Sequence, residues 1–203
     1  MEQTGNRITL RGSLLQLPQF SHENHGRQFY RFLLEVPRLS GAVDVLPVIA
    51  EAHIIEQIDP TAGEMLTVCG QMRSHNQRNE QGRHLLIFVF ASSITVEDGE
   101  PINEVVLEGP LCREPTFRRT PLGREICDVM LAVPRAFRRA DYLPCILWGR
   151  TAQEVSVCHT RDCIRIYGRL QSRIYTKLTE DGLHQRTAYE ISALSAEILE
   201  QQI

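Results

Sequence analysis

The chain has 203 residues, of which 42% are hydrophobic and 23% are charged, and its formal net charge is −3. This profile is typical of a globular protein and argues against disorder; no apolar run reaches the roughly 18 positions that a membrane helix needs, and no secretion signal opens the chain. Its six cysteines form no CxxC pair, so we expect reduced thiols in a cytoplasmic protein without a disulfide framework.

The first half of the chain indicates mostly strands. Ile8, Leu10 and Leu14 alternate with polar residues, which is the period of a half-buried strand. A short helix is expected near residues 50–58, and a hairpin loop at residues 79–82.

Residues 97–101 read Glu-Asp-Gly-Glu-Pro, which is the composition of a linker. We therefore expect one domain at residues 1–98 and a second at residues 101–203. The first 102 residues carry 8 basic and 12 acidic side chains, whereas the remainder carries 14 basic and 13 acidic ones. Random scatter of charge explains this difference about as well as function does.

The second half repeats the pattern. Gly109 inside its first strand predicts a bulge or a sharp bend. The expected helix covers residues 150–159 and separates the third strand from the fourth. The expected strands are residues 105–109, 125–133, 141–148, 163–172 and 187–199. Five strands with a helix between the third and fourth is the order of the OB-fold, a partly open Greek-key barrel.

Self-comparison shows a duplication. When the chain is shifted by 97 residues, residues 6–47 lie over residues 103–144 with 15 identities in 42 positions, where composition alone gives about two or three. Matched pairs include Gly12 with Gly109 and Asp44 with Asp141. The fold class is therefore all-β, with two tandem OB-fold barrels, each with a short helix between its third and fourth strands.

Several segments of the second repeat resemble the family of bacterial single-stranded DNA-binding proteins. They are the spaced pattern Asn103, Val105, Leu107, Gly109, Leu111 and Pro115, and the segments 145–150 and 166–173. The resemblance covers the second repeat and, more weakly, the first. It implies binding of single-stranded DNA with little sequence preference, in replication, recombination or repair, without catalysis and without a cofactor.

The family stacks bases on aromatic rings, and four of its ring positions fall on aromatic residues here. Stacking accepts any base, at about 1–3 kcal/mol per stacked base. The resemblance therefore assigns stacking roles to Phe137, Tyr142, Trp148 and Tyr175.

Phosphates need cations along the same groove. Arginine suits this role because its planar guanidinium can both pair with phosphate and stack on a base. The basic residues near the four rings, which we expect to contact phosphates, are Arg118, Arg119, Arg135, Arg138, Arg139, Arg150, Arg169, Arg173 and Lys177.

The first repeat lacks all four rings. The equivalent positions hold Ser40, Val45, Glu51 and Gln77, and a carboxylate repels phosphate. We therefore expect the first repeat to be a scaffold or dimerisation module. Alternatively, it binds DNA through other side chains, namely Arg73, His75 and Arg78 with Phe29 and Tyr30.

The family usually works with four OB-folds, so two per chain predict a homodimer, the commonest closed assembly. Family members usually end in a flexible acidic tail that recruits partners, and this sequence shows none. That difference keeps open a second function, a protein-interaction module such as a primosomal or recombination accessory factor with weak nucleic-acid binding.

An enzyme is disfavoured because no nucleophile or phosphate-loop motif occurs. The segment from Cys158 to Cys163 offers two thiols and His159, but its spacing fits no standard zinc module. We therefore expect no metal.

Overall fold

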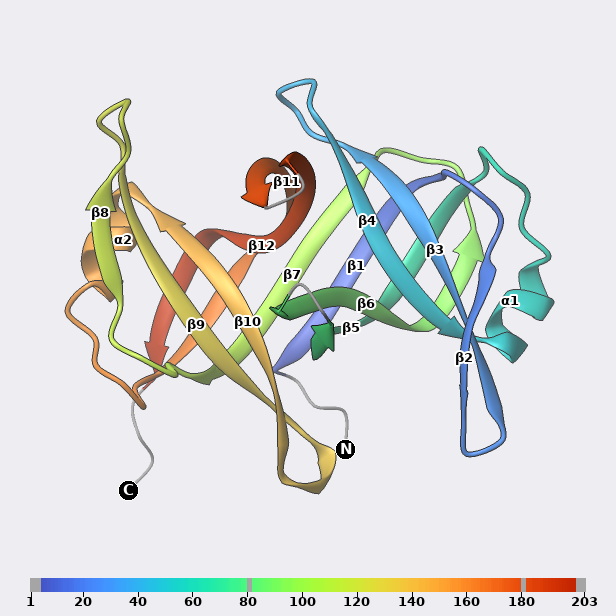
Figure 1. Ribbon diagram of the computed structural model, residues 1–203, viewed down its shortest axis with the longest axis horizontal. Helices are drawn as coiled ribbons and strands as arrows, with labels where there is room; N and C mark the ends of the chain where they lie inside the picture. Colours follow the sequence, from blue (N-terminus) through green and yellow to red (C-terminus); the bar gives the residue numbers. More distant parts are fainter. Residues whose placement is uncertain (1–4, 80–81, 180–181, 200–203) are drawn as a thin grey trace.

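The computed structural model describes residues 5–79, 82–179 and 182–199, which form two barrels of antiparallel and parallel strands (Figure 1). The first barrel contains one helix, α1 (Ala52–Ile58), between its fourth and fifth strands. Its strands are β1 (Asn6–Leu14), β2 (Gln19–Asn24), β3 (Arg27–Pro37), β4 (Val43–Glu51), β5 (Met65–Asn79) and β6 (Gly82–Val96).

The second barrel repeats this order. A single 3-10 turn, η1 (Ala136–Arg138), joins its third and fourth strands, and α2 (Gly149–Val155) follows the fourth. Its strands are β7 (Ile102–Pro110), β8 (Thr116–Arg119), β9 (Glu125–Arg135), β10 (Arg139–Trp148), β11 (Cys163–Thr179) and β12 (Gly182–Leu199). The expected all-β class with two tandem OB-folds is confirmed.

Each barrel closes in the same way. In the first, β1 pairs with β5, β5 with β6, β6 in parallel with β4, β4 with β3, and β3 again with β1. In the second, β7, β11, β12, β10 and β9 follow the same sequence. The contact of Leu111 with Leu131 closes that ring, as that of Leu14 with Leu34 closes the first.

Two features differ from the sequence expectation. Each half has six strands rather than five, because β2 and β8 were missed; both lie at an edge of the sheet, and their side chains are nearly all exposed, so they show no alternation. In addition, β11 runs to Thr179 and β12 starts at Gly182, well beyond the expected ends. The centre of the expected hairpin loop, residues 80–81, lies outside the described residues, as do residues 180–181.

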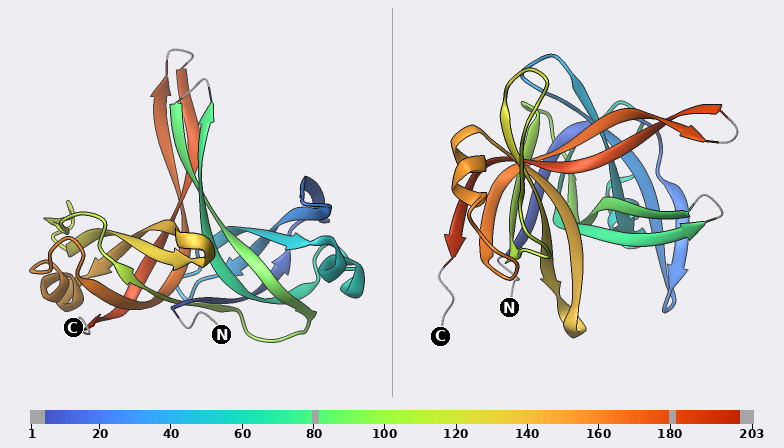
Figure 2. Two further views of the ribbon diagram at one scale, coloured as in Figure 1. Left: turned by 90° about the horizontal axis from the view of Figure 1, so that it is seen from below. Right: turned by 60° about the vertical axis from the view of Figure 1, so that its left-hand side comes forward.

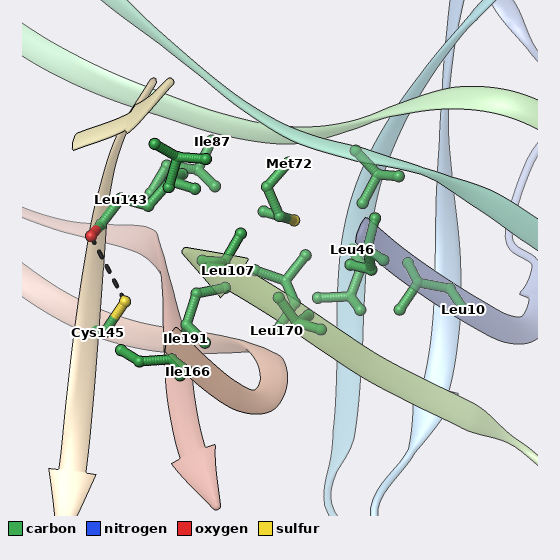
Figure 3. Close-up of a cluster of buried hydrophobic side chains, with 14 of the residues drawn as sticks. Leu10, Leu46, Met72, Ile87, Leu107, Leu143, Cys145, Ile166, Leu170 and Ile191 are labelled. Atoms are coloured by element: carbon green, nitrogen blue, oxygen red, sulfur yellow. Dashed lines mark hydrogen bonds between the residues drawn. The ribbon is translucent and has the colours of Figure 1, made fainter. Parts of the chain in front are cut away.

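The barrels share one sheet and one core. β1 and β7 pair side by side over six residues each, and a single cluster of buried apolar side chains runs through both halves. Leu10 and Leu46 of the first barrel and Leu107 and Ile191 of the second belong to this cluster (Figure 3). This continuous burial fixes how the two barrels sit against each other.

Gly109 is required for close packing rather than for a bulge. β7 stays in register with β11 through this residue. A Cβ atom added to Gly109 would lie 2.4 Å from the carbonyl oxygen of Ala132 on β9, and one added to Gly12 would lie 2.4 Å from that of Glu35 on β3. Each glycine therefore allows the first strand of its barrel to cross closely over the third.

Two hairpins extend beyond the barrels. We call residues 73–79 and 82–88 of β5 and β6 the first arm, and residues 172–179 and 182–189 of β11 and β12 the second arm. The arms rise side by side from the same face of the molecule (Figure 2), and Arg186 Nη1 lies 3.2 Å from His84 Nδ1 between them. Neither of the two helices in the described residues has the length and apolarity needed to cross a membrane.

Candidate nucleic-acid interface

The second barrel has a groove of about 460 Å³ on its outer face. Strands β8, β9 and β10 supply most of its lining, and the segments flanking β8 and the root of the second arm supply the rest. Among the lining residues are Trp148, Arg118 and Arg173, so the structure brings one predicted ring and two predicted phosphate ligands together.

Trp148 reaches the groove because of strand alternation. On β10, Leu143, Cys145 and Leu147 point into the core, so the residues between them point outward. Tyr142 and Trp148 therefore share the outer face, with 45% and 38% of their surface exposed. The Trp148 Nε1–H donates to Ser192 Oγ at 3.1 Å, which fixes the indole at the end of the groove.

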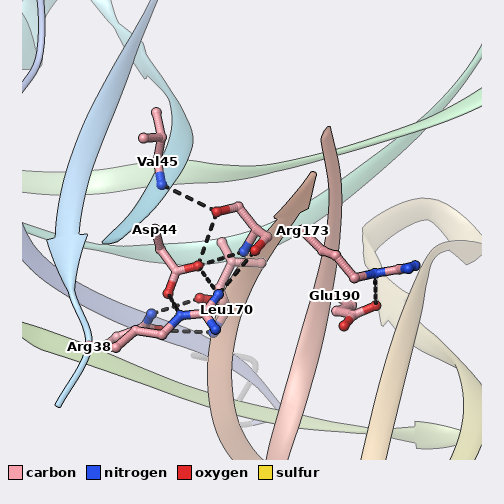
Figure 4. A network of polar contacts seen from close by, with 8 residues as sticks. Arg38, Asp44, Val45, Leu170, Arg173 and Glu190 are labelled. Carbon is pink, nitrogen blue, oxygen red and sulfur yellow. Dashed lines mark hydrogen bonds and ion pairs between the residues drawn. The ribbon is translucent and has the colours of Figure 1, made fainter. Parts of the chain in front are cut away.

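Arg173 and Tyr175 extend the site along the second arm. The Arg173 guanidinium lies 5.9 Å from the centre of the Tyr175 ring, within cation–π range, and the ring is 37% exposed. Arg173 Nε also lies 3.8 Å from Glu190 Oε2 (Figure 4). Because the guanidinium is exposed and its contact with Glu190 is long, it can turn to a phosphate at small cost.

Phe137 lies apart from the groove, in the turn at the end of the β9–β10 hairpin. It is 94% exposed, and its φ of 60° and that of Arg138, 57°, are in the left-handed region. A bulky residue adopts this conformation at a cost, and here the turn holds the ring in solvent. Arg138 and Arg139 are exposed in the same turn.

The other predicted phosphate ligands have carboxylate partners or lie elsewhere. Arg119 Nη2 donates to Glu125 at 2.8 Å and Arg150 Nε to Glu154 at 2.8 Å, both in exposed pairs. Such pairs contribute little stability, so the guanidinium groups remain available. Arg118 is bonded twice to Asp128, and Arg135 is bonded to the buried Asp141. Arg169 is half-buried on β11, and the side chain of Lys177 lies outside the described residues.

Sequence reasoning missed several residues that line the groove. Arg113, Thr116 and Thr120 flank or belong to β8; missing this strand hid them, although Arg113 lies close to the Pro115 of the recognised pattern. Two carboxylates, Asp128 and Glu190, also line the groove. No sequence signal points to acidic groups in a site for phosphates.

Glu190 is the less accessible of these carboxylates, with 17% of its side chain exposed. Burial raises its pKa, and the Asp128 charge acts in the same direction, while Arg173, Arg118 and Arg38 oppose the shift. An acid with a raised pKa in the folded state holds its proton more firmly there than in the unfolded chain. Its ionisation therefore costs stability as the pH rises through the folded-state pKa.

We predict that Glu190→Gln raises the melting temperature at pH 7, because a neutral amide avoids the cost of the buried charge. A gain of about 1 kcal/mol corresponds to about 2–4 °C in a chain of this size. The difference from the wild-type protein should shrink near pH 4, where the unfolded-state carboxyl also protonates. Thermal unfolding followed by circular dichroism at both pH values measures this, and a lower melting temperature at pH 7 would mean that the Arg173 contact outweighs burial.

The first barrel arranges different side chains at the equivalent place. Glu51 replaces Trp148 and lies 3.5 Å from both Arg27 and His53. Phe90 stands where the second barrel has Ser192, because Ile49 pairs with Phe90 as Ile146 pairs with Ser192. Phe90 packs against Phe29, with ring centres 5.9 Å apart.

The residues proposed as an alternative binding set in the first repeat have different surroundings in the structure. Phe29 is almost fully buried and is stacked by His22 at 4.9 Å, whereas Tyr30 packs edge-on against Phe20. Arg73 contacts Asp141 of the second barrel, and the side chain of Arg78 lies outside the described residues.

All six cysteines are free thiols, and three of them, Cys127, Cys145 and Cys158, are buried. Burial raises the pKa of Cys127 to about 11, so this thiol stays protonated at neutral pH. In the described part of the chain, no group of three or more His, Cys, Asp or Glu side chains is placed to hold a metal ion. His159 instead faces Glu114, with Nδ1 and Oε2 3.2 Å apart.

These features define a tandem OB-fold protein with a groove lined by an aromatic ring and guanidinium groups. Residues 102–199 match the model of the "Single-strand binding protein family". The single-stranded DNA-binding protein B of Bacillus subtilis is 35% identical over 89 residues, which cover 40% of this chain and 77% of the relative. The chain belongs to the single-strand binding protein family.

Other relatives are longer than the matched region. The single-stranded DNA-binding protein A of Bacillus subtilis is 36% identical over 107 residues, 49% of this chain, and the match covers 60% of that relative. The crystal structure of the wild-type single-stranded DNA binding protein from Thermus aquaticus superposes with a TM-score of 0.80 at 21% identity, covering 98% of this chain and 94% of that one. The likeness extends the fold assignment to both barrels.

Proposed function

We propose that the chain binds single-stranded DNA with little sequence preference, by stacking bases on Phe137, Tyr142, Trp148 and Tyr175 and by pairing phosphates with the surrounding arginines. The relatives are named as single-stranded DNA-binding proteins, which supports this function. The observation that carries it is the groove, because it combines the exposed Trp148 ring with Arg118 and Arg173. Ring and cation within one groove is the combination that unpaired strands require.

The proposal gives the two repeats, residues 1–98 and 101–203, different tasks. The second repeat holds most of the DNA, and the first serves as scaffold or dimerisation module. We further propose a cytoplasmic homodimer that presents four OB-folds, acting without catalysis or cofactor in DNA replication, recombination or repair. The carboxylate at position 51 in place of a ring supports the unequal division.

A fluorescence titration tests the function directly, because the chain contains a single tryptophan. We predict that oligo-dT quenches Trp148 emission and that added salt reverses the quenching, since phosphate contacts release counterions. Between 50 and 200 mM salt, about six phosphate contacts would lower the affinity about 1000-fold. Unchanged emission combined with no shift of the oligonucleotide in a gel would favour the alternative, a protein-interaction module.

A further inference from the structure

In each barrel, a buried aspartate accepts hydrogen bonds from the arm of the other barrel. Asp44 on β4 and Asp141 on β10 occupy equivalent positions, and both are fully buried. Asp44 binds Ser172 at the root of the second arm, and Asp141 binds Ser74 in the first arm. We call Arg38, Asp44 and Ser172 the first clasp, and Arg135, Asp141 and Ser74 the second clasp.

In the first clasp, Ser172 is bonded by both Asp44 and Arg38, which are labelled in Figure 4. Its backbone N–H and its hydroxyl donate to Asp44 Oδ1 at 2.7 and 3.1 Å, while its carbonyl oxygen accepts from Arg38 Nη2 at 3.0 Å. Arg38 also donates to both carboxylate oxygens of Asp44, at 2.7 and 2.5 Å, and this bonding raises the pKa of the guanidinium. Charge-assisted bonds of this kind are about twice as strong as neutral ones.

The first clasp lies next to residues of the second arm that belong to the candidate DNA site. Ser172 immediately precedes Arg173, which lines the groove, and lies three residues before Tyr175. Residues of the first barrel thus hold the second arm at the point where it leaves its own barrel. The direction of the arm, and with it the positions of Arg173 and Tyr175, depends on Arg38 and Asp44.

The second clasp links the first arm to Tyr142 of the second barrel. The Ser74 backbone N–H donates to Asp141 Oδ1 at 2.7 Å, and the Ser74 hydroxyl oxygen accepts from the Tyr142 backbone N–H at 2.7 Å. Arg73 and Arg135 complete the neutralisation of Asp141, each 3.4 Å from its carboxylate. A serine of the first arm therefore fixes the strand that presents the Tyr142 ring.

We infer that Asp44, Arg38 and Ser74 of the first barrel are positioning residues for the DNA site of the second barrel, acting through Ser172 and the Tyr142 backbone. The inference rests on the proposed function and gives the scaffold role of the first repeat a physical basis. A site for an unpaired strand gains affinity when its rings and cations are held in place before binding, because less side-chain and loop freedom is lost.

Double-mutant cycles on the full-length chain test the first clasp, with labelled oligo-dT anisotropy as the readout. Ser172→Ala and Asp44→Asn should each lower the affinity about 3-fold to 10-fold. Loss of the Asp44 charge by itself would strengthen phosphate binding, so a weaker complex points to positioning. In a Tyr175→Ala, Arg173→Ala background, the same substitutions should have little effect, because the groups that they position are gone.

Ser74→Ala with Tyr142→Ala forms the corresponding cycle for the second clasp. Thr67→Val is the matched control, since it removes a hydroxyl that accepts from Arg11 at 2.7 Å within the first barrel and away from both arms; it should leave the affinity unchanged. Thermal unfolding of every variant separates loss of fold from loss of position, and Ser172→Ala is the milder change should Asp44→Asn fail to fold.

Equal losses in both backgrounds, or unchanged affinity in the clasp variants, would overturn the inference. If the wild-type chain itself neither quenched Trp148 nor bound oligo-dT, the proposed function would fail instead.

Discussion

Trp148→Ala should lower the affinity for oligo-dT about 10-fold to 100-fold, within the range for losing one or two stacked bases. The reason is the place of the ring. Trp148 is partly exposed, is oriented by Ser192, and lines the groove together with Arg118 and Arg173. Trp148→Phe keeps a flat face and should retain most of the affinity, although it removes the fluorescent reporter. Gel shift or anisotropy with a labelled oligonucleotide therefore measures both variants.

The duplication supplies a control for this substitution. Glu51 occupies the equivalent position in the first barrel, and its carboxylate faces Arg27 and His53. Glu51→Ala should leave DNA affinity unchanged or slightly higher, because it removes a negative charge and no ring. If Glu51→Ala and Trp148→Ala weakened binding equally, the unequal division between the repeats would be wrong.

The barrels could be predicted because their signal lies in local alternation and in the repeat. Leu10, Gly12 and Leu14 match Leu107, Gly109 and Leu111, and the leucines of both sets are buried. The second arm could not be predicted to its full length, since Ile174 and Leu183 are exposed there and none of its described side chains is buried. Edge strands such as β8 escape the same test, because all four of its residues are exposed.

The candidate site, like the fold, could be predicted only in part from the sequence. The four rings were proposed from a family resemblance, and the structure leaves each of them at least 37% exposed. The groove also contains Glu190, and the clasps join residues such as Asp44 and Ser172, which are 128 positions apart. Contacts over such distances depend on how two barrels dock, and no motif or spacing in one sequence encodes them. Asp44 and Asp141 are an identity between the repeats, as are Arg38 with Arg135 and, at a shift of 98, Ser74 with Ser172, but these identities do not indicate that the residues bond across the two barrels.

A large loss of stability is expected from alanine at the two crossing glycines. Gly109→Ala places a Cβ 2.4 Å from the Ala132 carbonyl oxygen, and Gly12→Ala places one at the same distance from that of Glu35. Backbone atoms cannot rotate away, so the first strand of the barrel must move off the third. Each single change should cost about 3 kcal/mol, at the upper end for overpacking. The double variant should lose about 6 kcal/mol, a large part of the total stability of about 5–15 kcal/mol that proteins have.

Gly26 and Gly123 provide the matched pair, as both have positive φ, 72° and 77°, and a Cβ on either meets nothing within 4 Å. Alanine at these turns costs about 1–2 kcal/mol through backbone strain alone. In urea unfolding, the turn variants should therefore be more stable than the crossing variants. Gly12→Ala and Gly109→Ala should also cost similar amounts, because both barrels close at the same crossing. A small loss of stability at one glycine and a large loss at the other would show that one barrel can shift its first strand to accommodate the added Cβ and the other cannot.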